Sequence, residues 1–314
     1  MTRFPLITVL LVLAAFAVAT QDRYLMDVFV LTCLYGTMAV AWNLAAGFTG
    51  LLSLGHSLFI GIGAYTVAYG VTAHGLSPWV MLPIAILIAV ACALAIGVLC
   101  FRYGLKGYYF GIATLAFSEI AFFLVSAAVW LGRSDGLMLP AGGEPWVSLQ
   151  FRAKWPYGLM ILVILLATLI GGWALLRSKT GYYWRSIRDN EEAAEALGVP
   201  IFGFKLFSFA LSAGIVAVCG AFYATYVAFV DPRSVLGVEL SIQLLVFSII
   251  GGMGLLWGPL LGAAILIPAS ELLRIWVGGA FYGVNIVLYA SLLIVLALFL
   301  PQGLGALRWR RKVS

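Results

Sequence analysis

Long runs of apolar residues dominate this sequence, and short polar segments separate them. A transmembrane helix needs about 20 apolar residues to cross a hydrocarbon core about 30 Å thick. Ten runs approach or reach that length, although the eighth is short. The predicted spans are 4–20, 27–46, 51–73, 79–100, 108–130, 157–176, 205–229, 239–252, 258–276 and 281–300. The pattern therefore predicts an all-α integral membrane protein with about ten transmembrane helices.

The composition and the charge pattern agree with a membrane location. Apolar residues make up 64% of the chain and charged residues 10%, whereas a soluble domain carries about 25% charged residues. The net charge of +6 comes from Lys and Arg residues in the short segments between runs, which argues against a basic nucleic-acid-binding face. If the N-terminus is cytoplasmic, 12 of the 18 Lys and Arg residues fall on that side. The positive-inside rule therefore predicts that both termini are cytoplasmic.

The first run has a second interpretation. Arg3 precedes it, and the small residues Ala17 and Ala19 resemble a signal-peptide cleavage site, so residues 1–20 could be a cleaved signal peptide instead of a span. The charge distribution does not distinguish the two, because the chain from Gln21 onward begins outside in both cases.

Two longer polar segments separate the runs within what we expect to be a single transmembrane domain, 1–314. Residues 131–156 are predicted to form a structured external loop, and residues 177–204 the only sizeable cytoplasmic loop. Two glycine-rich segments, 50–55 and 254–258, can be aligned with each other. Such a similarity occurs in transporters built from two related halves, and chance similarity between Gly- and Leu-rich helices explains it equally well.

The cytoplasmic segment 187–198 is predicted to contain a short exposed helix. Asp189 or Asn190 can cap its N-terminus, and Gly198, followed by Pro200, can end it. So short a polar helix is not stable on propensity alone, so we expect it to dock on another subunit or on the bundle's own cytoplasmic face.

Isolated polar residues inside predicted spans are candidates for the translocation pathway, because burying them in lipid is costly. These candidates are Asn43, Ser53, His56, Thr114 and Glu119. His56 and Ser53 are three residues apart and could share a helix face. The alternative for His56 is a packed, hydrogen-bonded neutral imidazole, and for Glu119 a hydrogen bond or ion pair with another helix or chain.

Several functional classes lack support in the sequence. The cysteines Cys33, Cys92, Cys100 and Cys219 have no metal or redox spacing. We expect no catalytic, cofactor-binding or metal-binding residues, because no nucleophile, base and orienting group occur at plausible spacing. No Gly-x-x-x-x-Gly-Lys-Ser/Thr phosphate loop occurs, so ATP and Mg²⁺ would have to be bound by other subunits.

The chain resembles a known transporter family at several places. Glu192, Ala193 and Ala194, followed by Gly198, resemble the coupling motif of ABC importer permeases. The segments 43–65, 107–119, 188–190 and 251–259 resemble the LivM-type branched-chain amino-acid permeases, in order over roughly residues 27–300. Leu51, where many relatives have Gln, and Arg133, which replaces a Gly, depart from the family pattern.

The resemblance implies a permease subunit, and not an enzyme, of an ATP-driven importer of branched-chain amino acids in the bacterial inner membrane. It implies four kinds of partner: a homologous second permease chain, two cytoplasmic ATPase subunits, a periplasmic substrate-binding protein and the lipid bilayer. The coupling residues it implies are Arg188, Asp189, Asn190, Glu192, Ala193, Ala194 and Gly198. The alternatives are a permease for urea or short amides and a secondary transporter or channel that works alone.

Overall fold

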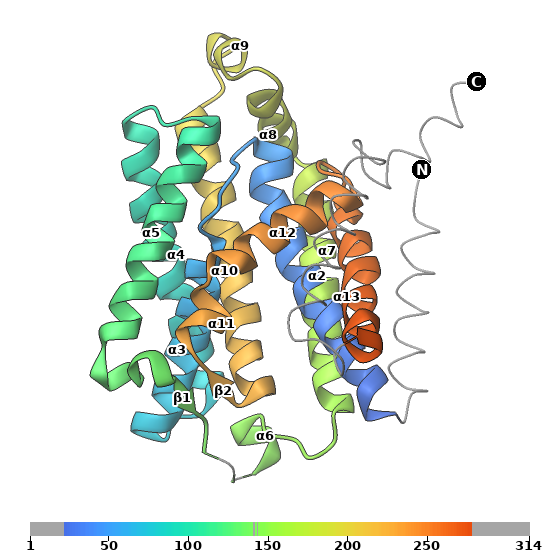
Figure 1. The fold of residues 1–314 in the computed structure, drawn as a ribbon. Coiled ribbons are helices and arrows are strands. Elements are labelled where there is room, and N and C mark those ends of the chain that lie inside the picture. Colours follow the sequence, from blue (N-terminus) through green and yellow to red (C-terminus); the bar gives the residue numbers. More distant parts are fainter. Residues whose placement is uncertain (1–21, 141, 143, 278–314) are drawn as a thin grey trace, which may run out of the picture.

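The computed structural model describes residues 22–140, 142 and 144–277 of the chain. The predicted spans 4–20 and 281–300, and both chain termini, lie outside the described residues. The described part is a bundle of long helices that run roughly along one axis, with short elements at both ends (Figure 1). We refer to these ends as the α9 end and the α6 end.

The elements follow one another in the order of their numbers. The longer helices are α2 (Arg23–Thr49), α3 (His56–His74), α4 (Pro78–Arg102), α5 (Gly107–Ala127), α7 (Trp155–Arg177), α10 (Ile201–Val227), α12 (Val238–Gly251) and α13 (Gly258–Val277). The shorter elements are η1 (Val129–Leu131), η2 (Arg133–Asp135), β1 (Leu137–Met138), α6 (Pro145–Ser148), α8 (Lys179–Asp189), α9 (Glu191–Ala196), β2 (Phe229–Val230) and α11 (Pro232–Leu236).

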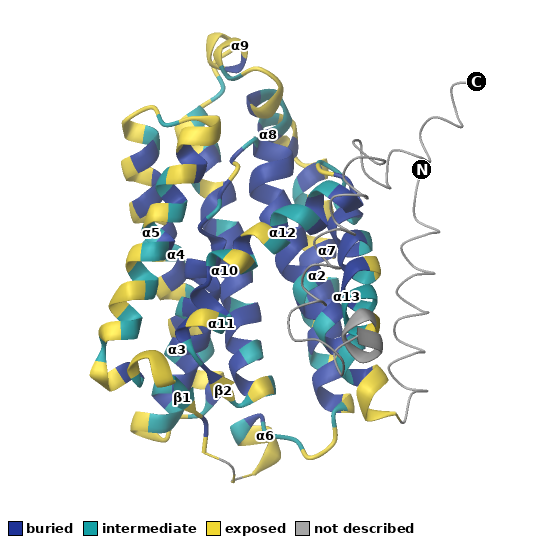
Figure 2. Cartoon of the chain, viewed as in Figure 1, coloured by how far each residue is buried: buried dark blue, intermediate teal, exposed yellow. Residues whose placement is uncertain are grey.

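Helix α2 forms the centre of the bundle. It packs against α7, α8, α10, α12 and α13, and 72% of its span is buried, against 33% for α4 and 22% for α5. The outer helices α4 and α5 expose large apolar side chains such as Leu87 and Phe123, whereas α2 is mostly buried (Figure 2). Exposed apolar surface of this extent is covered by lipid or by another chain, so α4 and α5 form part of the outer apolar surface of the bundle.

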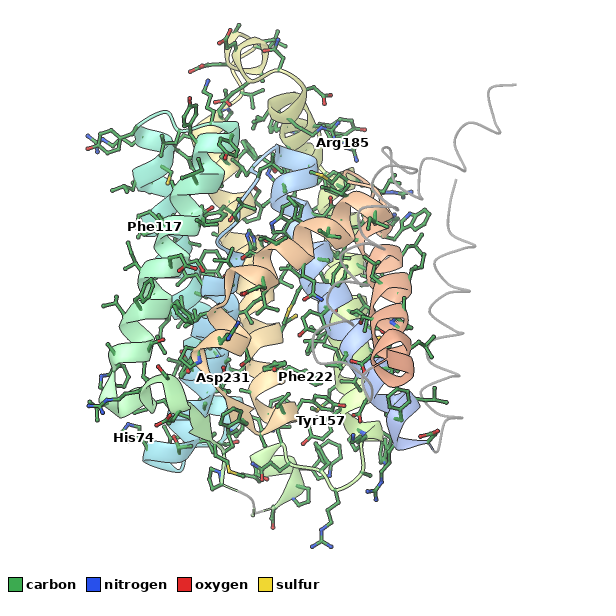
Figure 3. All side chains as sticks on the ribbon, viewed as in Figure 1. His74, Phe117, Tyr157, Arg185, Phe222 and Asp231 are labelled. Carbon is green, nitrogen blue, oxygen red and sulfur yellow. The ribbon has the colours of Figure 1, made fainter. Side chains whose placement is uncertain are left out.

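Helices α3 and α10 approach each other more closely than most neighbouring helices can. A Cβ atom on Gly63 of α3 would lie 2.1 Å from the carbonyl oxygen of Ala217, and one on Gly220 of α10 would lie 2.1 Å from that of Ile60. Glycine is therefore required on both sides of this crossing, because any side chain would collide with backbone. Further along α10, Phe222 packs edge-on against Tyr157 of α7, with ring centroids 6.2 Å apart (Figure 3).

The structure confirms an all-α membrane protein but supports fewer spans than the sequence predicted. Six stretches of the described chain are long and apolar enough to cross a membrane. They are α2, α4, α5, α7, α10 and the stretch Pro232–Gly251, which combines α11 and α12. Two predicted spans do not meet these criteria. Helix α3 is a buried helix of 19 residues with His and Ser at its start, and the apolar part of α13 is shorter.

The start of one predicted span also needs correction. The span 51–73 begins as a helix only at His56, because Gly50 ends α2 and residues 51–55 are not helical. Apolar residues continue through this break in the helix, which hydropathy alone does not detect. The short eighth span, 239–252, agrees with α12 to within one residue at each end.

The segment 131–156 at the α6 end is structured. Strand β1 pairs with β2 in antiparallel register, with Leu137 opposite Val230. This pairing joins the segment to the turn between α10 and α11. The indole N–H of Trp79 in α4 donates a hydrogen bond to the Trp146 carbonyl in α6 at 2.7 Å. The segment is therefore attached at two places, to β2 and to α4.

Candidate functional site

Helix α9 stands at the tip of the bundle, beyond α8 (Figure 1). Its N-cap is Asn190, whose side-chain oxygen accepts a hydrogen bond from the Ala193 N–H at 3.0 Å. Gly198 has a φ of +81°, the left-handed conformation with which glycine ends helices. The cap and the stop are where the sequence predicted them. Residues 187–189, however, belong to α8, so the exposed helix begins at Glu191.

The outer surface of α9 is polar with one large apolar side chain. Glu192, Ala193 and Gly198 are exposed, while Ala194 is buried against the neighbouring helices. Leu197 is 84% exposed. A helix of six residues does not hold its shape by propensity alone, so its caps and its contacts with the bundle keep it in place. The coupling residues predicted from the motif therefore lie on a small, accessible surface, except Ala194, which faces the bundle.

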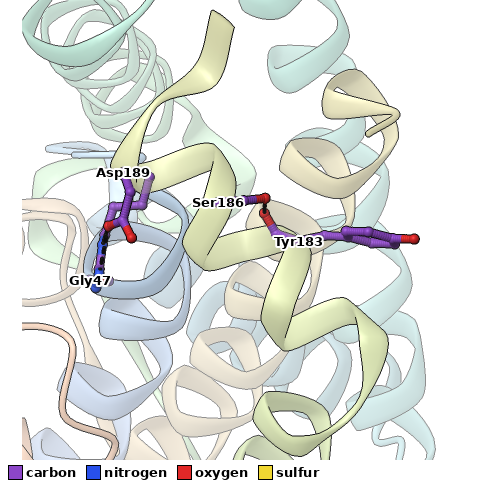
Figure 4. Close-up of polar contacts among 5 residues, drawn as sticks. Gly47, Tyr183, Ser186 and Asp189 are labelled. Carbon is purple, nitrogen blue, oxygen red and sulfur yellow. Dashed lines mark hydrogen bonds and ion pairs between the residues drawn. The ribbon is translucent and has the colours of Figure 1, made fainter. Parts of the chain in front are cut away.

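Arg188 connects this surface to the central helix. Its guanidinium group donates a hydrogen bond to the carbonyl oxygen of Gly47, in the last turn of α2, at 3.0 Å (Figure 4). Two further bonds, at 2.8 and 3.0 Å, go to one carboxylate oxygen of Asp189. The planar guanidinium can make all three contacts at once, which a lysine could not. Arg188 therefore joins the end of α8 to the end of α2.

A non-helical segment, residues 50–55, separates α2 from α3, and we call it the first break. The indole N–H of Trp42 donates a hydrogen bond to the Ser53 carbonyl at 2.8 Å, and the Leu54 N–H donates to the Thr114 hydroxyl of α5 at 3.1 Å. A Cβ atom on Gly55 would lie 2.1 Å from the Thr114 carbonyl oxygen. The first break is therefore held by α2 on one side and by α5 on the other.

His56 follows the first break and is fully buried. The Ser212 hydroxyl donates to the Ala41 carbonyl at 2.7 Å, so it accepts a hydrogen bond from Nε2–H of His56 at 2.8 Å. Nδ1 then accepts a hydrogen bond from the Ser53 hydroxyl at 3.0 Å. These bonds assign the tautomer, since hydrogen positions follow from the network. Both nitrogens of a neutral imidazole are satisfied, which favours the interpretation of His56 as a packed, hydrogen-bonded residue.

A second break, residues 252–257, separates α12 from α13. Gly252 and Gly254 have φ angles of +114° and +78°. Asn43 of α2 fixes this segment with both ends of its amide: the oxygen accepts from the Gly254 N–H at 3.1 Å, and the nitrogen donates to the Leu255 carbonyl at 2.9 Å. A Cβ atom on Gly254 would lie 3.0 Å from a guanidinium nitrogen of Arg188. The second break therefore lies between α2 and α8.

The structure brings together most of the candidate pathway residues. Asn43, Ser53, His56 and Thr114 all hold one of the two breaks. Glu119, in the middle of α5, is half-buried and takes part in none of these hydrogen bonds. Within the described residues there is no group of three or more His, Cys, Asp or Glu side chains that could hold a metal ion.

Sequence reasoning missed several residues of these networks. Ser57, Ser118 and Ser241 form a chain of hydroxyl hydrogen bonds of 2.7 and 3.0 Å that joins α3, α5 and α12. A serine at a helix crossing cannot be told from other small packing residues in a sequence, so the local sequence does not predict these serine–serine hydrogen bonds. Lys205, which pairs with Glu191 at 2.6 Å, carries one signal, a single cation at the start of an apolar run.

Comparison with known proteins agrees with these features. Residues 24–299 match the model of a family described as the permease component of branched-chain amino acid transport systems. The chain is 31% identical to the high-affinity branched-chain amino acid transport system permease protein LivM of Escherichia coli K12, over 94% of this chain and 73% of the relative. The LivM protein of Salmonella typhimurium LT2 is 30% identical over the same shares.

A second kind of relative matches a shorter part of the chain. The autoinducer 2 import system permease protein LsrC of Klebsiella pneumoniae is 32% identical over 48% of this chain and 47% of the relative. The family match extends from α2 through both breaks and α9, so it includes all the features described above. The chain is therefore a multi-pass membrane protein that belongs to the family of permease components of branched-chain amino acid transport systems.

Proposed function

We propose that this chain is the membrane-spanning subunit of an ATP-driven importer of branched-chain amino acids, and that α9 is its docking site for a cytoplasmic ATPase. The observation that carries the proposal is the arrangement of residues 188–198, which we call the α8–α9 corner. The motif residues Glu192, Ala193 and Gly198 are exposed at the tip of the molecule, while Arg188 of the same corner contacts the end of α2 and approaches the second break. A force applied to α9 would therefore reach the centre of the bundle directly.

The energy source must lie outside this chain, because its sequence contains no phosphate-binding loop. The proposed complex contains a homologous second permease chain, two ATPase subunits that bind ATP and Mg²⁺, and a periplasmic protein that delivers the substrate. The α9 end then faces the cytoplasm and the α6 end faces the periplasm of a bacterial inner membrane. The segment 131–156, fixed to the helices by β1 and α6, is the surface offered to the binding protein.

The two breaks suggest how access alternates between the two sides. Interrupted helices place backbone groups inside a membrane protein, where they bind substrates or allow helix halves to move separately. Here α2 contacts both breaks, through Trp42 and Asn43. A shift of α8 and α2 that follows ATPase closure would therefore move the first break and the second break relative to α5.

The proposed substrate rests on the relatives and on the chemistry of the breaks. The LivM relatives are named for branched-chain amino acids, and the LsrC relatives, which match less of the chain, are named for autoinducer 2. The side chains that hold the breaks, those of Asn43, Ser53, His56 and Thr114, are neutral, and the nearby Arg188 guanidinium is engaged by Gly47 and Asp189. These neutral groups in apolar surroundings are compatible with an aliphatic side chain, and most of the selection is then left to the binding protein.

The first experiment is purification of the tagged chain in mild detergent, with mass spectrometry of the proteins that accompany it. Recovery of a homologous permease and of ATPase subunits is expected, and recovery of the chain alone under several mild conditions would favour a transporter that works by itself. The recovered complex is then reconstituted with its binding protein, and uptake of leucine, isoleucine and valine is measured with and without ATP. Uptake of urea, acetamide or autoinducer 2 instead would change the substrate assignment.

Two substitutions test the docking role of α9. Glu192→Lys reverses an exposed charge on the docking surface, and Gly198→Val places a branched side chain at a φ of +81°. Both are expected to abolish ATP-dependent uptake while the protein still inserts in the membrane. Lys179→Glu, which reverses an exposed charge in the first turn of α8 outside the predicted coupling residues, is the matched control for a change of charge. Normal uptake by both variants would remove α9 from the mechanism.

A further inference from the structure

The α9 end of the bundle contains a buried cation. Lys205 of α10 is 5% exposed and is the one buried charged residue among those that the structure describes. Its ammonium group lies over the ring of Phe101, 5.7 Å from the centroid. Burying a charge without a partner is strongly destabilising. The partner of Lys205 is therefore expected to stay in contact with it.

The partner is Glu191, the first residue of α9. One carboxylate oxygen of Glu191 accepts a hydrogen bond from Lys205 at 2.6 Å, and the other lies 3.4 Å from the ammonium group of Lys106. The Lys106 side chain is 54% exposed, so this second pair adds little to stability. Glu191 nevertheless contacts two cations that belong to two different parts of the bundle.

The two lysines occupy the beginnings of two long helices. Lys106 is the N-cap residue of α5, and Lys205 lies in the second turn of α10. The two helices differ in how tightly they are held: α10 has glycine-mediated contact with α3, whereas α5 is the least buried of the spans. A displacement of Glu191 would therefore move α5 more readily than α10.

Helix α5 leads from Lys106 to the first break. Thr114, two turns further along α5, accepts the hydrogen bond from the Leu54 N–H, and Ser118 bonds to Ser57 of α3 at 2.7 Å. Arg188, three residues before Glu191, leads instead to α2 and the second break. The α8–α9 corner thus has a separate contact with each break.

We propose that Glu191 is a positioning residue of the transport reaction: its carboxylate fixes α9 to α10 through Lys205 and passes movement of α9 to α5 and the first break through Lys106. The proposal rests on the proposed function, in which α9 meets the ATPase. It differs from a purely structural role, in which Glu191 serves only to neutralise Lys205. The structural role needs one contact, whereas the positioning role also needs Lys106.

Variants of the full complex, reconstituted in liposomes with its ATPase and binding protein, distinguish the two roles. Three quantities are measured for each: the amount of ATPase that co-purifies, the rate of ATP hydrolysis, and the uptake of leucine per ATP hydrolysed. Lys106→Met breaks the contact with α5 and leaves the buried pair intact. Glu191→Gln with Lys205→Met removes the buried charges together, which avoids leaving an unpaired cation. Lys179→Met is the control, since Lys179 is an exposed cation at the same end that is not paired with Glu191.

The decisive quantity is the amount of leucine taken up per ATP hydrolysed. We expect it to fall about threefold with Lys106→Met and about tenfold with the Glu191→Gln, Lys205→Met double variant, as for residues along a coupling route. Co-purification of the ATPase should stay at the wild-type level, and Lys179→Met should change nothing. A wild-type ratio in Lys106→Met would overturn the proposal, whatever the double variant does, while leaving the docking role of α9 intact. Failure of the wild-type chain to retain any ATPase would instead overturn the proposed function, and this inference with it.

Discussion

The two breaks differ in what holds them. The first break, residues 50–55, is held by Trp42 of α2 and by Thr114 of α5. The second break, residues 252–257, is held by Asn43 of α2 and lies beside Arg188 of α8. Both breaks therefore share a contact with α2, whereas α5 holds the first break and Arg188 lies beside the second. The shared contact couples the two breaks, and the separate contacts allow each to be perturbed on its own.

The largest expected effect comes from filling the close contact at the first break. Gly55→Ala places a Cβ atom 2.1 Å from the backbone oxygen of Thr114, which cannot move aside, and should cost about 3 kcal/mol or more. At the second break, Gly254→Ala meets only the end of the Arg188 side chain at 3.0 Å and the Gly47 carbonyl oxygen at 3.4 Å, and with a φ of +78° it should cost less, about 1–2 kcal/mol. Thermal unfolding in detergent measures both. Gly171→Ala, with nothing within 4 Å, is the control. Equal costs at both breaks would contradict the comparison.

The next effect comes from removing the polar groups that hold the breaks. Asn43→Leu leaves the Gly254 N–H and the Leu255 carbonyl unpaired, at a cost of about 2–4 kcal/mol, whereas Thr114→Val frees only the Leu54 N–H, at about 1–2 kcal/mol. Thermal unfolding should rank them in that order. Thr168→Val removes a hydroxyl that bonds within its own helix and should be near neutral. The reverse order would mean that the second break is the more weakly held.

A smaller effect is expected from weakening the contact of Arg188 with the end of α2, a change that concerns the second break and not the first. Arg188→Lys loses the three-bond guanidinium geometry at the end of α2 but keeps the charge, and should lower ATP-dependent uptake about threefold with little change in unfolding temperature. Arg185→Lys is the matched control on the same helix, because Arg185 makes only a long contact of 3.4 Å with the Leu176 carbonyl. If both variants transport equally well, α8 does not act on the second break.

The smallest effect is expected at Asn190, the N-cap of α9, which lies between Arg188 and Glu191 in the sequence. Asn190→Ala removes the N-cap and should cost about 1 kcal/mol of local helix stability, whereas Asn190→Asp keeps an acceptor and should cost almost nothing. Backbone hydrogen exchange of residues 191–198 in the assembled complex would measure this. Equal exchange in the two variants would show that docking, and not the cap, orders α9.

The long helices could be predicted from the sequence because their formation depends on local composition. Helices α2, α4, α5, α7 and α10 begin and end within a few residues of the predicted spans. The prediction was wrong at residues 51–55, where three leucines continue the apolar pattern although the chain is not helical. The glycines at positions 50 and 55 gave a signal, but the break depends on contact with Thr114, which is 60 residues away.

The candidate site was predictable in its members but not in its connections. Asn43 stood out as a polar residue in an apolar run, yet its partners lie more than 200 residues further along the chain. Glu191 was visible only as one of several acidic residues in a loop, and its importance comes from two lysines that belong to other helices. Pairings of this kind depend on how the helices pack, which the local sequence does not specify.

The crossing of α3 and α10 has a consequence for other conformations of this chain. Because Gly63 and Gly220 bring each backbone against the other, the two helices cannot slide or rotate relative to each other without collision. They form a fixed reference frame within the permease. Structures of the inward-open and outward-open states should therefore superpose best on α3 and α10, and the displacements of all other helices are properly measured from that pair.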